Sequence, residues 1–170
     1  MAEDVTIAGP SVLHLYAAID QDDTNWIVIL KDIGPDVGVQ TAREGERDIS
    51  RLHERELTRG WLKASHRAID AKRSLPGRPW HPLTRAARKP VAPDEINEYA
   101  IEIMATANEF KRGHRICVEI ASLDVATGVG GATNVEYIPY HICSSKTVLH
   151  RIYHDPRHPS HLLLPVIANV

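Results

Sequence analysis

Short apolar segments rich in β-branched residues recur along the chain between clusters of Asp, Asn, Gly and Pro. No long segment repeats apolar residues at positions i, i+3, i+4 and i+7 between helix caps. The pattern predicts β-strands over residues 12–18, 26–33, 57–67, 96–104, 116–123, 135–143, 147–153 and 162–167. Because no helix follows each strand, a parallel doubly wound sheet is disfavoured, and we expect an all-β sandwich of two sheets.

The clearest alternation lies in residues 116–123, where Ile116, Val118 and Ile120 share one face of the predicted strand. Trp26 begins another apolar run, directly after a polar stretch whose short side chains suit a loop. We therefore expect Trp26 in the core.

Two connections differ from short turns. Residues 40–56 are crowded with Arg and Glu and predict a solvated connection or a short surface helix. Five prolines, at positions 76, 79, 82, 90 and 93, interrupt regular structure and predict a long surface segment. A loop of this length suggests that it docks against a neighbour. Glycines at 128, 130 and 131 predict a turn.

Composition limits the class of protein. The 170 residues are the usual size of one domain, and 43% apolar with 25% charged residues is typical of a globular chain. A net charge of −2 gives no overall basic footprint, so nucleic acid is not an expected partner. The first ten residues hold no secretory or transmembrane pattern, which predicts a cytoplasmic protein without membrane contact. Cys117 and Cys143 are expected to be reduced thiols.

Sequence motifs for catalysis or cofactor binding are missing. No serine lies in Gly-x-Ser-x-Gly, and the glycines at 128–131 lack the Lys and Ser or Thr of a phosphate loop. Ser65 and His66 are adjacent, but adjacent strand residues point to opposite faces. We therefore expect no catalytic residue and no cofactor.

Ten histidines raise the question of a metal site, above all those at 150, 154, 158 and 161. Prolines 156 and 159 interrupt this stretch, so His154 and His158 need not share a helical face, and we expect no metal. The tryptophans keep a sugar-stacking surface open as an alternative. Trp80, between Pro79 and His81, is the better candidate for an exposed anchor at an interface.

Several motifs, in order and spacing, resemble the C-terminal domain of the cocaine esterase/NonD and X-Pro dipeptidyl-peptidase family of serine hydrolases. They cover nearly the whole chain: residues 7–10, 22–26, 58–67, 79–82, 110–115, 153–156 and 158–160, leading into 162–166. The stretch from Thr58 to Arg67 is the densest match. One departure is Met104 to Asn108, where relatives usually carry a Trp-Pro-Thr motif.

The resemblance implies a jelly-roll β-sandwich similar to galactose-binding domains. It implies further that residues 1–170 form a single domain of this kind. It also implies that the catalytic α/β-hydrolase domain is absent from this chain and is the expected partner, in cis or in trans. In the family the sandwich supports the active-site cleft and can contribute to oligomer contacts, so a homo-oligomer is a further expectation. The candidate interface residues are Trp61, His66, Arg67, Trp80, His81, His114 and Arg115.

Three functions follow from these observations. The first is an accessory domain of a serine hydrolase that cleaves acyl esters or X-Pro peptides and is not catalytic alone. The second is a stand-alone module that binds a carbohydrate or another small ligand, on fold analogy. The third is a cupin-like metalloenzyme that uses the histidines.

Overall fold

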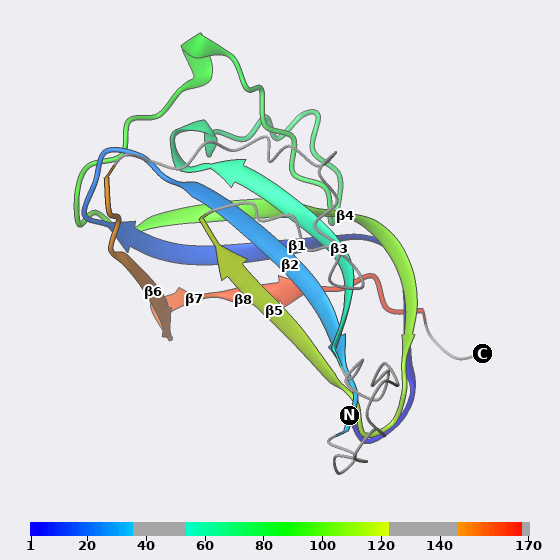
Figure 1. Ribbon diagram of the computed structural model, residues 1–170. Helices are drawn as coiled ribbons and strands as arrows, with labels where there is room; N and C mark the ends of the chain where they lie inside the picture. The colour runs from blue at the N-terminus through cyan, green and yellow to red at the C-terminus, as the bar shows by residue number, and fades with distance from the viewer. Residues whose placement is uncertain (36–53, 123–145, 168–170) are drawn as a thin grey trace, which may run out of the picture.

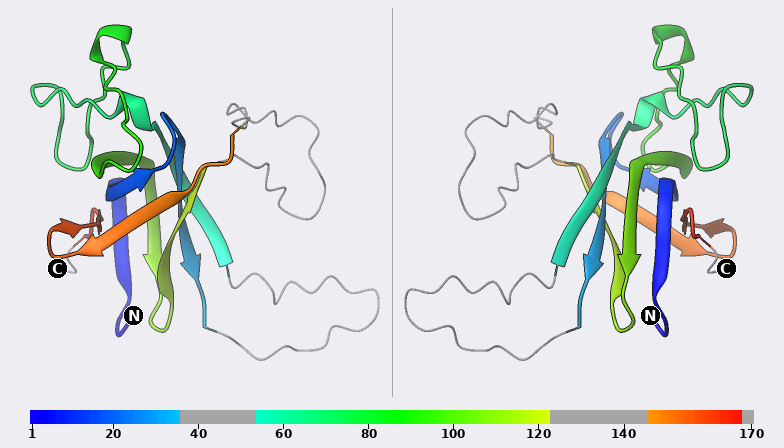
Figure 2. Two further views of the ribbon diagram at one scale, coloured as in Figure 1. Left: turned by 90° about the vertical axis from the view of Figure 1, so that its left-hand side faces the viewer. Right: turned by 90° about the vertical axis from the view of Figure 1, so that its right-hand side faces the viewer.

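The computed structural model describes residues 1–35, 54–122 and 146–167, and these residues form two antiparallel sheets. The first sheet contains β1 (Val5–Ile19), β4 (Asn97–Phe110), β6 (His150–Asp155), β7 (His158–Pro159) and β8 (His161–Leu163). The second contains β2 (Asn25–Ile33), β3 (Glu54–Lys63) and β5 (Arg115–Ala121). Figures 1 and 2 show the two sheets packed face to face, which confirms the predicted all-β sandwich.

Strand β1 organises the first sheet. It pairs with β4 along one edge, and with β6 and β8 along the other. It is longer than the predicted strand at 12–18, because it begins at Val5 and includes Gly9 and Pro10. The register with β4 shifts between Gly9 and Ser11, and Gly9 has a φ of +134°, so the two residues form a bulge.

The core lies between the sheets and follows the alternation of β2. Trp26, Val28 and Leu30 point into it, and Trp26 is 1% exposed. The indole ring of Trp26 packs 5.2 Å from the ring of Tyr99 on β4 and 4.9 Å from the ring of His150 on β6. The predicted core position of Trp26 is confirmed, and one side chain joins both sheets.

The loop before β2 is closed by a short side chain, as expected. Asp23 Oδ1 accepts hydrogen bonds from the backbone amides of Thr24, at 3.1 Å, and of Ser65, at 3.0 Å. The second bond, together with that from the Ala64 amide to the Thr24 carbonyl at 2.9 Å, ends β3 at Lys63. The prediction that this strand continues to residue 67 is therefore wrong, since residues 64–66 form a 3-10 turn, η2 (Ala64–His66).

The expectation for residues 40–56 is wrong for its last three residues. Glu54 to Glu56 belong to β3 and pair with Lys31 to Ile33 of β2. Lys31 forms ion pairs with Glu54 and with Glu119 of β5, which raise the pKa of its ammonium group above the ordinary value. Charged residues can thus form an exposed strand face when a cation lies between them.

Other strand boundaries shift by a few residues. β4 runs to Phe110, six residues beyond the predicted end, and therefore includes the stretch from Met104 to Asn108. β6 begins three residues later than the strand predicted at 147–153, and β8 begins one residue earlier than the strand predicted at 162–167. The short strand β7 was not predicted. The predicted strand at 135–143 and the predicted turn at 128–131 lie outside the described residues.

The two sheets meet at one edge, where β3 crosses β4. A Cβ atom added to Gly60 would lie 2.1 Å from the Glu102 carbonyl oxygen, so only glycine allows this approach. The Thr58 hydroxyl donates to the Met104 carbonyl at 2.9 Å beside it. The proline-rich segment leaves η2 at this corner and projects from one end of the sandwich before it reaches β4 (Figure 2). It includes a second 3-10 turn, η3 (Arg85–Ala87).

Trp26 and Trp61 form a matched pair for a stability test, since the first is buried and the second is 37% exposed. Replacing Trp26 by Ala should lower the free energy of unfolding by about 3–5 kcal/mol, because it leaves a cavity between the sheets. Trp61→Ala should cost less than about 1 kcal/mol. Urea denaturation measures both, and equal losses would contradict the assignment of Trp26 to the core.

Candidate functional site

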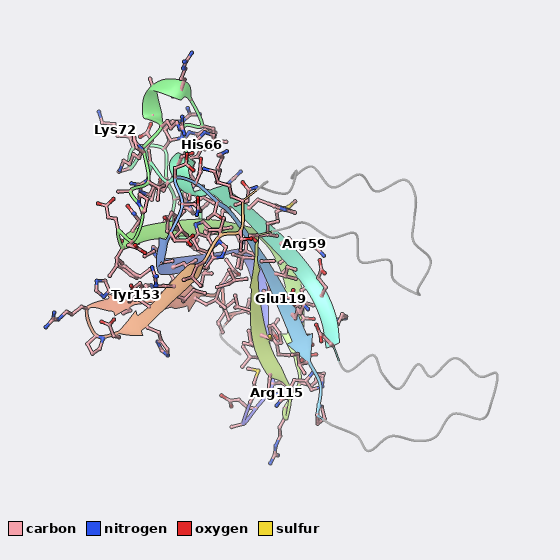
Figure 3. The ribbon with its side chains drawn as sticks, turned by 60° about the vertical axis from the view of Figure 1, so that its left-hand side comes forward. Arg59, His66, Lys72, Arg115, Glu119 and Tyr153 are labelled. Atoms are coloured by element: carbon pink, nitrogen blue, oxygen red, sulfur yellow. The ribbon has the colours of Figure 1, made fainter. Side chains whose placement is uncertain are left out.

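A groove of about 610 Å³ lies at the corner where the proline-rich segment meets β3 and β4. Its lining is mainly apolar: Trp61, Leu62, Lys63, His66, Pro79, Trp80, His81, Pro82, Leu83, Glu102 and Met104. His66 is labelled at this end of the molecule in Figure 3. A concave surface with two tryptophans and few polar groups is suited to binding another molecule.

The strand register places Trp61 on this surface. Leu62 pairs with Trp26 and points into the core, so Trp61, one residue earlier, pairs with Ile27 and points to the opposite face. The prediction that Trp61 is exposed enough to serve an interface therefore has a geometric basis. That it performs this role stays a prediction.

Trp80 is held by the folding of its own segment. The Trp80 amide donates to the Ser74 hydroxyl at 2.9 Å, and the Trp80 carbonyl accepts from the Asp70 amide at 2.9 Å. The guanidinium carbon of Arg73 lies 3.8 Å from the centre of the Trp80 ring and covers one ring face. The indole is 36% exposed, so it is presented in a fixed orientation with part of its surface accessible.

His81 attaches the proline-rich segment to β4. Its Nδ1 lies 2.9 Å from the Ala68 carbonyl oxygen, and its Nε2 lies 2.9 Å from the Ala100 carbonyl oxygen. These two contacts bridge the start of the segment and the strand beneath it. His81 is therefore a structural support of the groove as well as part of its lining.

Arg67 closes the other end of the segment. Its two terminal nitrogens donate to the carbonyl oxygens of Lys89, at 2.8 Å, and Pro90, at 3.0 Å. Arg67 does not line the first groove. It lies instead on a second, more polar one of about 430 Å³, together with His14 and Glu98.

His114 and Arg115 lie at the opposite end of the sandwich, as the separation of Arg115 and His66 in Figure 3 shows. His114 Nδ1 is 2.8 Å from Asp32 Oδ1, and this aspartate is only 6% exposed. Asn108 donates to the other oxygen of Asp32 at 3.4 Å. Gly113 has a φ of +86° and lies in the turn between β4 and β5. The seven candidate residues therefore do not share one surface: four line the groove, Arg67 is adjacent to it, and two are remote.

Residues that the sequence did not indicate complete the groove. Met104 is 59% exposed and lies beside Trp61 because β3 crosses β4, a long-range feature without a local signal. Leu83 is 63% exposed and has a φ of +53°, which is rare for a branched residue and costs on the order of 1 kcal/mol. The sequence signal for this unusual backbone conformation is limited to the position of Leu83 between Pro82 and Thr84 in the proline-rich segment.

The hydroxyl and imidazole groups of the described residues do not form a hydrolytic triad. Ser65 is 1% exposed and Thr24, whose hydroxyl lies 2.9 Å from His150 Nε2, is 8% exposed, so neither oxygen faces a substrate. The Ser160 hydroxyl donates to the Tyr153 carbonyl at 2.6 Å. The Ser160 hydroxyl is therefore used in backbone hydrogen bonding, and the Thr24 hydroxyl in a side-chain contact of the interior.

The C-terminal histidines separate in space. The rings of His14 and His161 stack at 4.7 Å, and His158 bonds to Asp155 at 3.1 Å. Backbone amide donation from Arg157, with help from His158, lowers the pKa of Asp155. No group of three or more potential metal ligands occurs within residues 1–35, 54–122 and 146–167. Cys117 is a half-buried free thiol, and Cys143 lies outside the described residues.

Within the part of the chain that the structure describes, no helix has the length and apolar character needed to cross a bilayer.

Comparison with known proteins identifies the class. Residues 1–163 match the model of the X-Pro dipeptidyl-peptidase C-terminal non-catalytic domain, and the chain belongs to this family. It is therefore an accessory C-terminal domain of a hydrolase.

Two kinds of relative agree with this assignment. The cocaine esterase of Rhodococcus sp. (strain MB1 Bresler) is 40% identical over 78 residues, which are 43% of this chain and 13% of the esterase. A crystal structure of a CocE/NonD family hydrolase from Staphylococcus aureus superposes with a TM-score of 0.75 at 22% identity, over 98% of this chain and 29% of the hydrolase.

An aminopeptidase from a marine sediment archaeon, Thaumarchaeota archaeon, has the same fold with a TM-score of 0.64 at 21% identity. The superposition covers 99% of this chain and 24% of the aminopeptidase. The chain thus spans less than a third of each of these larger proteins.

The partly buried His150 on β6 provides a pH test of the packing. Burial lowers the pKa of His150 below its ordinary value of 6.5. The unfolded chain therefore takes up a proton at a pH where the folded chain does not, and stability is lost as the pH falls below about 6.5. We expect the loss of unfolding free energy between about pH 7.5 and pH 5.5 to be smaller in His150→Gln than in the unmodified chain.

The exposed His154 supplies the control, because His154→Gln removes one histidine from the same strand without touching the core. This variant should keep the pH dependence of the unmodified chain. An unchanged dependence in His150→Gln would show that His150 is not the group responsible.

Proposed function

We propose that this chain serves as the accessory domain of a CocE/NonD-type serine hydrolase and docks on the catalytic α/β-hydrolase domain, in cis or in trans, through the groove of Trp61 and Trp80. The observation that carries the proposal is the groove itself. Two exposed tryptophans are fixed by strand register and by hydrogen bonds beside an exposed methionine. Interfaces are commonly centred on such rigid aromatic anchors.

The positive φ of Leu83 adds support. Backbone strain of this kind persists where the surroundings impose it, and it commonly accompanies a functional surface. Here it brings an exposed leucine to the rim of the groove. When a partner covers this exposed apolar side chain, its burial offsets the free-energy cost of the strained backbone.

The names of the relatives, which are an esterase, a CocE/NonD hydrolase and an aminopeptidase, support a proposal on the reaction class. We propose that the partner domain cleaves acyl esters or X-Pro peptide bonds, since no nucleophile of this chain is placed to do so among the described residues. A supporting role in the active-site cleft, a cytoplasmic location and a homo-oligomer belong to the same proposal.

A stand-alone carbohydrate module is less well supported. Sugar-binding surfaces stack rings on open tryptophan faces. Here Trp26 is buried, and Arg73 covers one face of Trp80. The family is that of a non-catalytic hydrolase domain, which favours a protein partner over a glycan.

Docking can be tested with the catalytic portion of the Rhodococcus cocaine esterase, produced without its own C-terminal domain. Calorimetric titration with this chain should show binding, which Trp61→Ala and Trp80→Ala together weaken by about 30-fold or more, because they remove two aromatic anchors. Arg115→Ala, at the far end of the sandwich, should bind like the unmodified chain. Absence of binding, or loss in the Arg115 variant alone, would contradict docking through the groove.

A further inference from the structure

The charge of the chain is distributed very unevenly. Residues 63–90 carry eight Lys and Arg against the single Asp70, a formal charge of +7. The other 142 residues carry twelve Lys and Arg against twenty-one Asp and Glu, a charge of −9, so the net charge of −2 conceals a basic segment. This segment includes η2, η3 and the proline-rich stretch, and it projects from one end of the sandwich (Figures 1 and 2).

Some of these cations are engaged within the structure. Arg67 donates to backbone carbonyls, Arg78 pairs with Glu102 at 3.2 Å, and Lys63 pairs with Asp23 at 3.4 Å. The Arg88 guanidinium lies 4.0 Å from the same aspartate. These contacts fold the segment but neutralise only part of its charge, because two carboxylates serve three cations.

The remaining cations are accessible. Lys72, Arg85 and Lys89 are exposed, and within the described residues no ion pair or side-chain hydrogen bond engages their charged ends. Lys72 and His66 are both labelled at the same end of the molecule in Figure 3. Arg73 lies directly on Trp80, so one of the charges touches the aromatic lining.

We propose that the groove and the basic segment form one docking surface, which recognises an acidic protein face that presents an aromatic or aliphatic side chain. The inference rests on the proposed function, since the catalytic hydrolase domain would supply this face. An apolar centre with a charged rim is the usual anatomy of a protein interface. Cations at the rim would attract acidic groups and orient the partner, while the two tryptophans receive its apolar side chain.

An acidic protein suits the surface better than nucleic acid does. The rest of the chain carries a charge of −9, so an extended polyanion that reached beyond the segment would meet repulsion. A compact acidic patch makes its contacts with the segment and avoids the remaining surface.

The surface can be tested without a catalytic domain, by nuclear magnetic resonance titration of the ¹⁵N-labelled full chain. The probe is a blocked synthetic peptide, Glu-Asp-Trp-Glu-Asp. We expect it to shift the indole signals of Trp61 and Trp80 and the amide signals of Lys72 and Arg85. Its affinity should fall at least severalfold between about 50 and 500 mM salt, because surface charges are screened. A peptide with Ala in place of Trp, or with Lys in place of all four acidic residues, should bind more weakly.

Matched charge reversals separate the segment from the general charge of the chain. The double variant Lys72→Glu with Arg85→Glu should weaken peptide binding by about tenfold, since each change removes an attraction and adds a repulsion. Arg115→Glu, an equal change per residue at the far end, should alter it less than about twofold. All three positions are exposed, so folding should be unaffected.

Equal effects of both reversals, binding of the Lys peptide as tight as that of the acidic one, or shifts outside the groove and segment would overturn the inference. Tighter binding of a single-stranded oligothymidylate to the same residues would overturn it in favour of nucleic acid. A salt-independent association with the catalytic portion of cocaine esterase that both reversals leave intact would also contradict the inference, while it would leave docking through the groove standing.

Discussion

The burial of Trp26 between the two sheets is the constraint on which both the fold and the candidate site depend. Its ring contacts Tyr99 on β4 and His150 on β6, so one side chain of the second sheet holds two strands of the first. Because Trp26 points inward, its cross-strand partner Leu62 must also point inward. Period-two alternation then directs Trp61 to the outer face. The groove is thus a consequence of core packing.

The groove is concave because β3 crosses β4 at this corner. The close approach of Gly60 to the backbone of β4 brings Met104 beside Trp61. The proline-rich segment then completes the groove, because His81 and Arg67 fasten its two ends to backbone carbonyls. Without these long-range contacts, the exposed tryptophans would be separate features of the surface.

The sequence was sufficient for those features that depend on local alternation. The all-β sandwich, the core position of Trp26, the strand at β2 and the exposed proline-rich segment were all predicted, because each leaves a pattern within a few residues. The errors occurred where distant partners decide. Gly9 and Pro10 lie outside the predicted strand but form a bulge within β1 against β4. Glu54 to Glu56 resemble a solvated connection but pair with a strand that carries Lys31. The same limit explains why Leu83 and Met104 were missed, and why His114 and Arg115 were grouped with residues at the other end of the molecule.

The account requires that chemistry is supplied by another domain, and the most direct measurement is hydrolysis of p-nitrophenyl esters and X-Pro amides by the purified chain, with a fluorophosphonate probe for activated serines. The account predicts neither turnover nor labelling, because Ser65 is 1% exposed and the Thr24 hydroxyl, which contacts His150, belongs to a residue that is 8% exposed. Turnover that the probe inhibits, with one labelled serine, would contradict the assignment of this chain as an accessory domain.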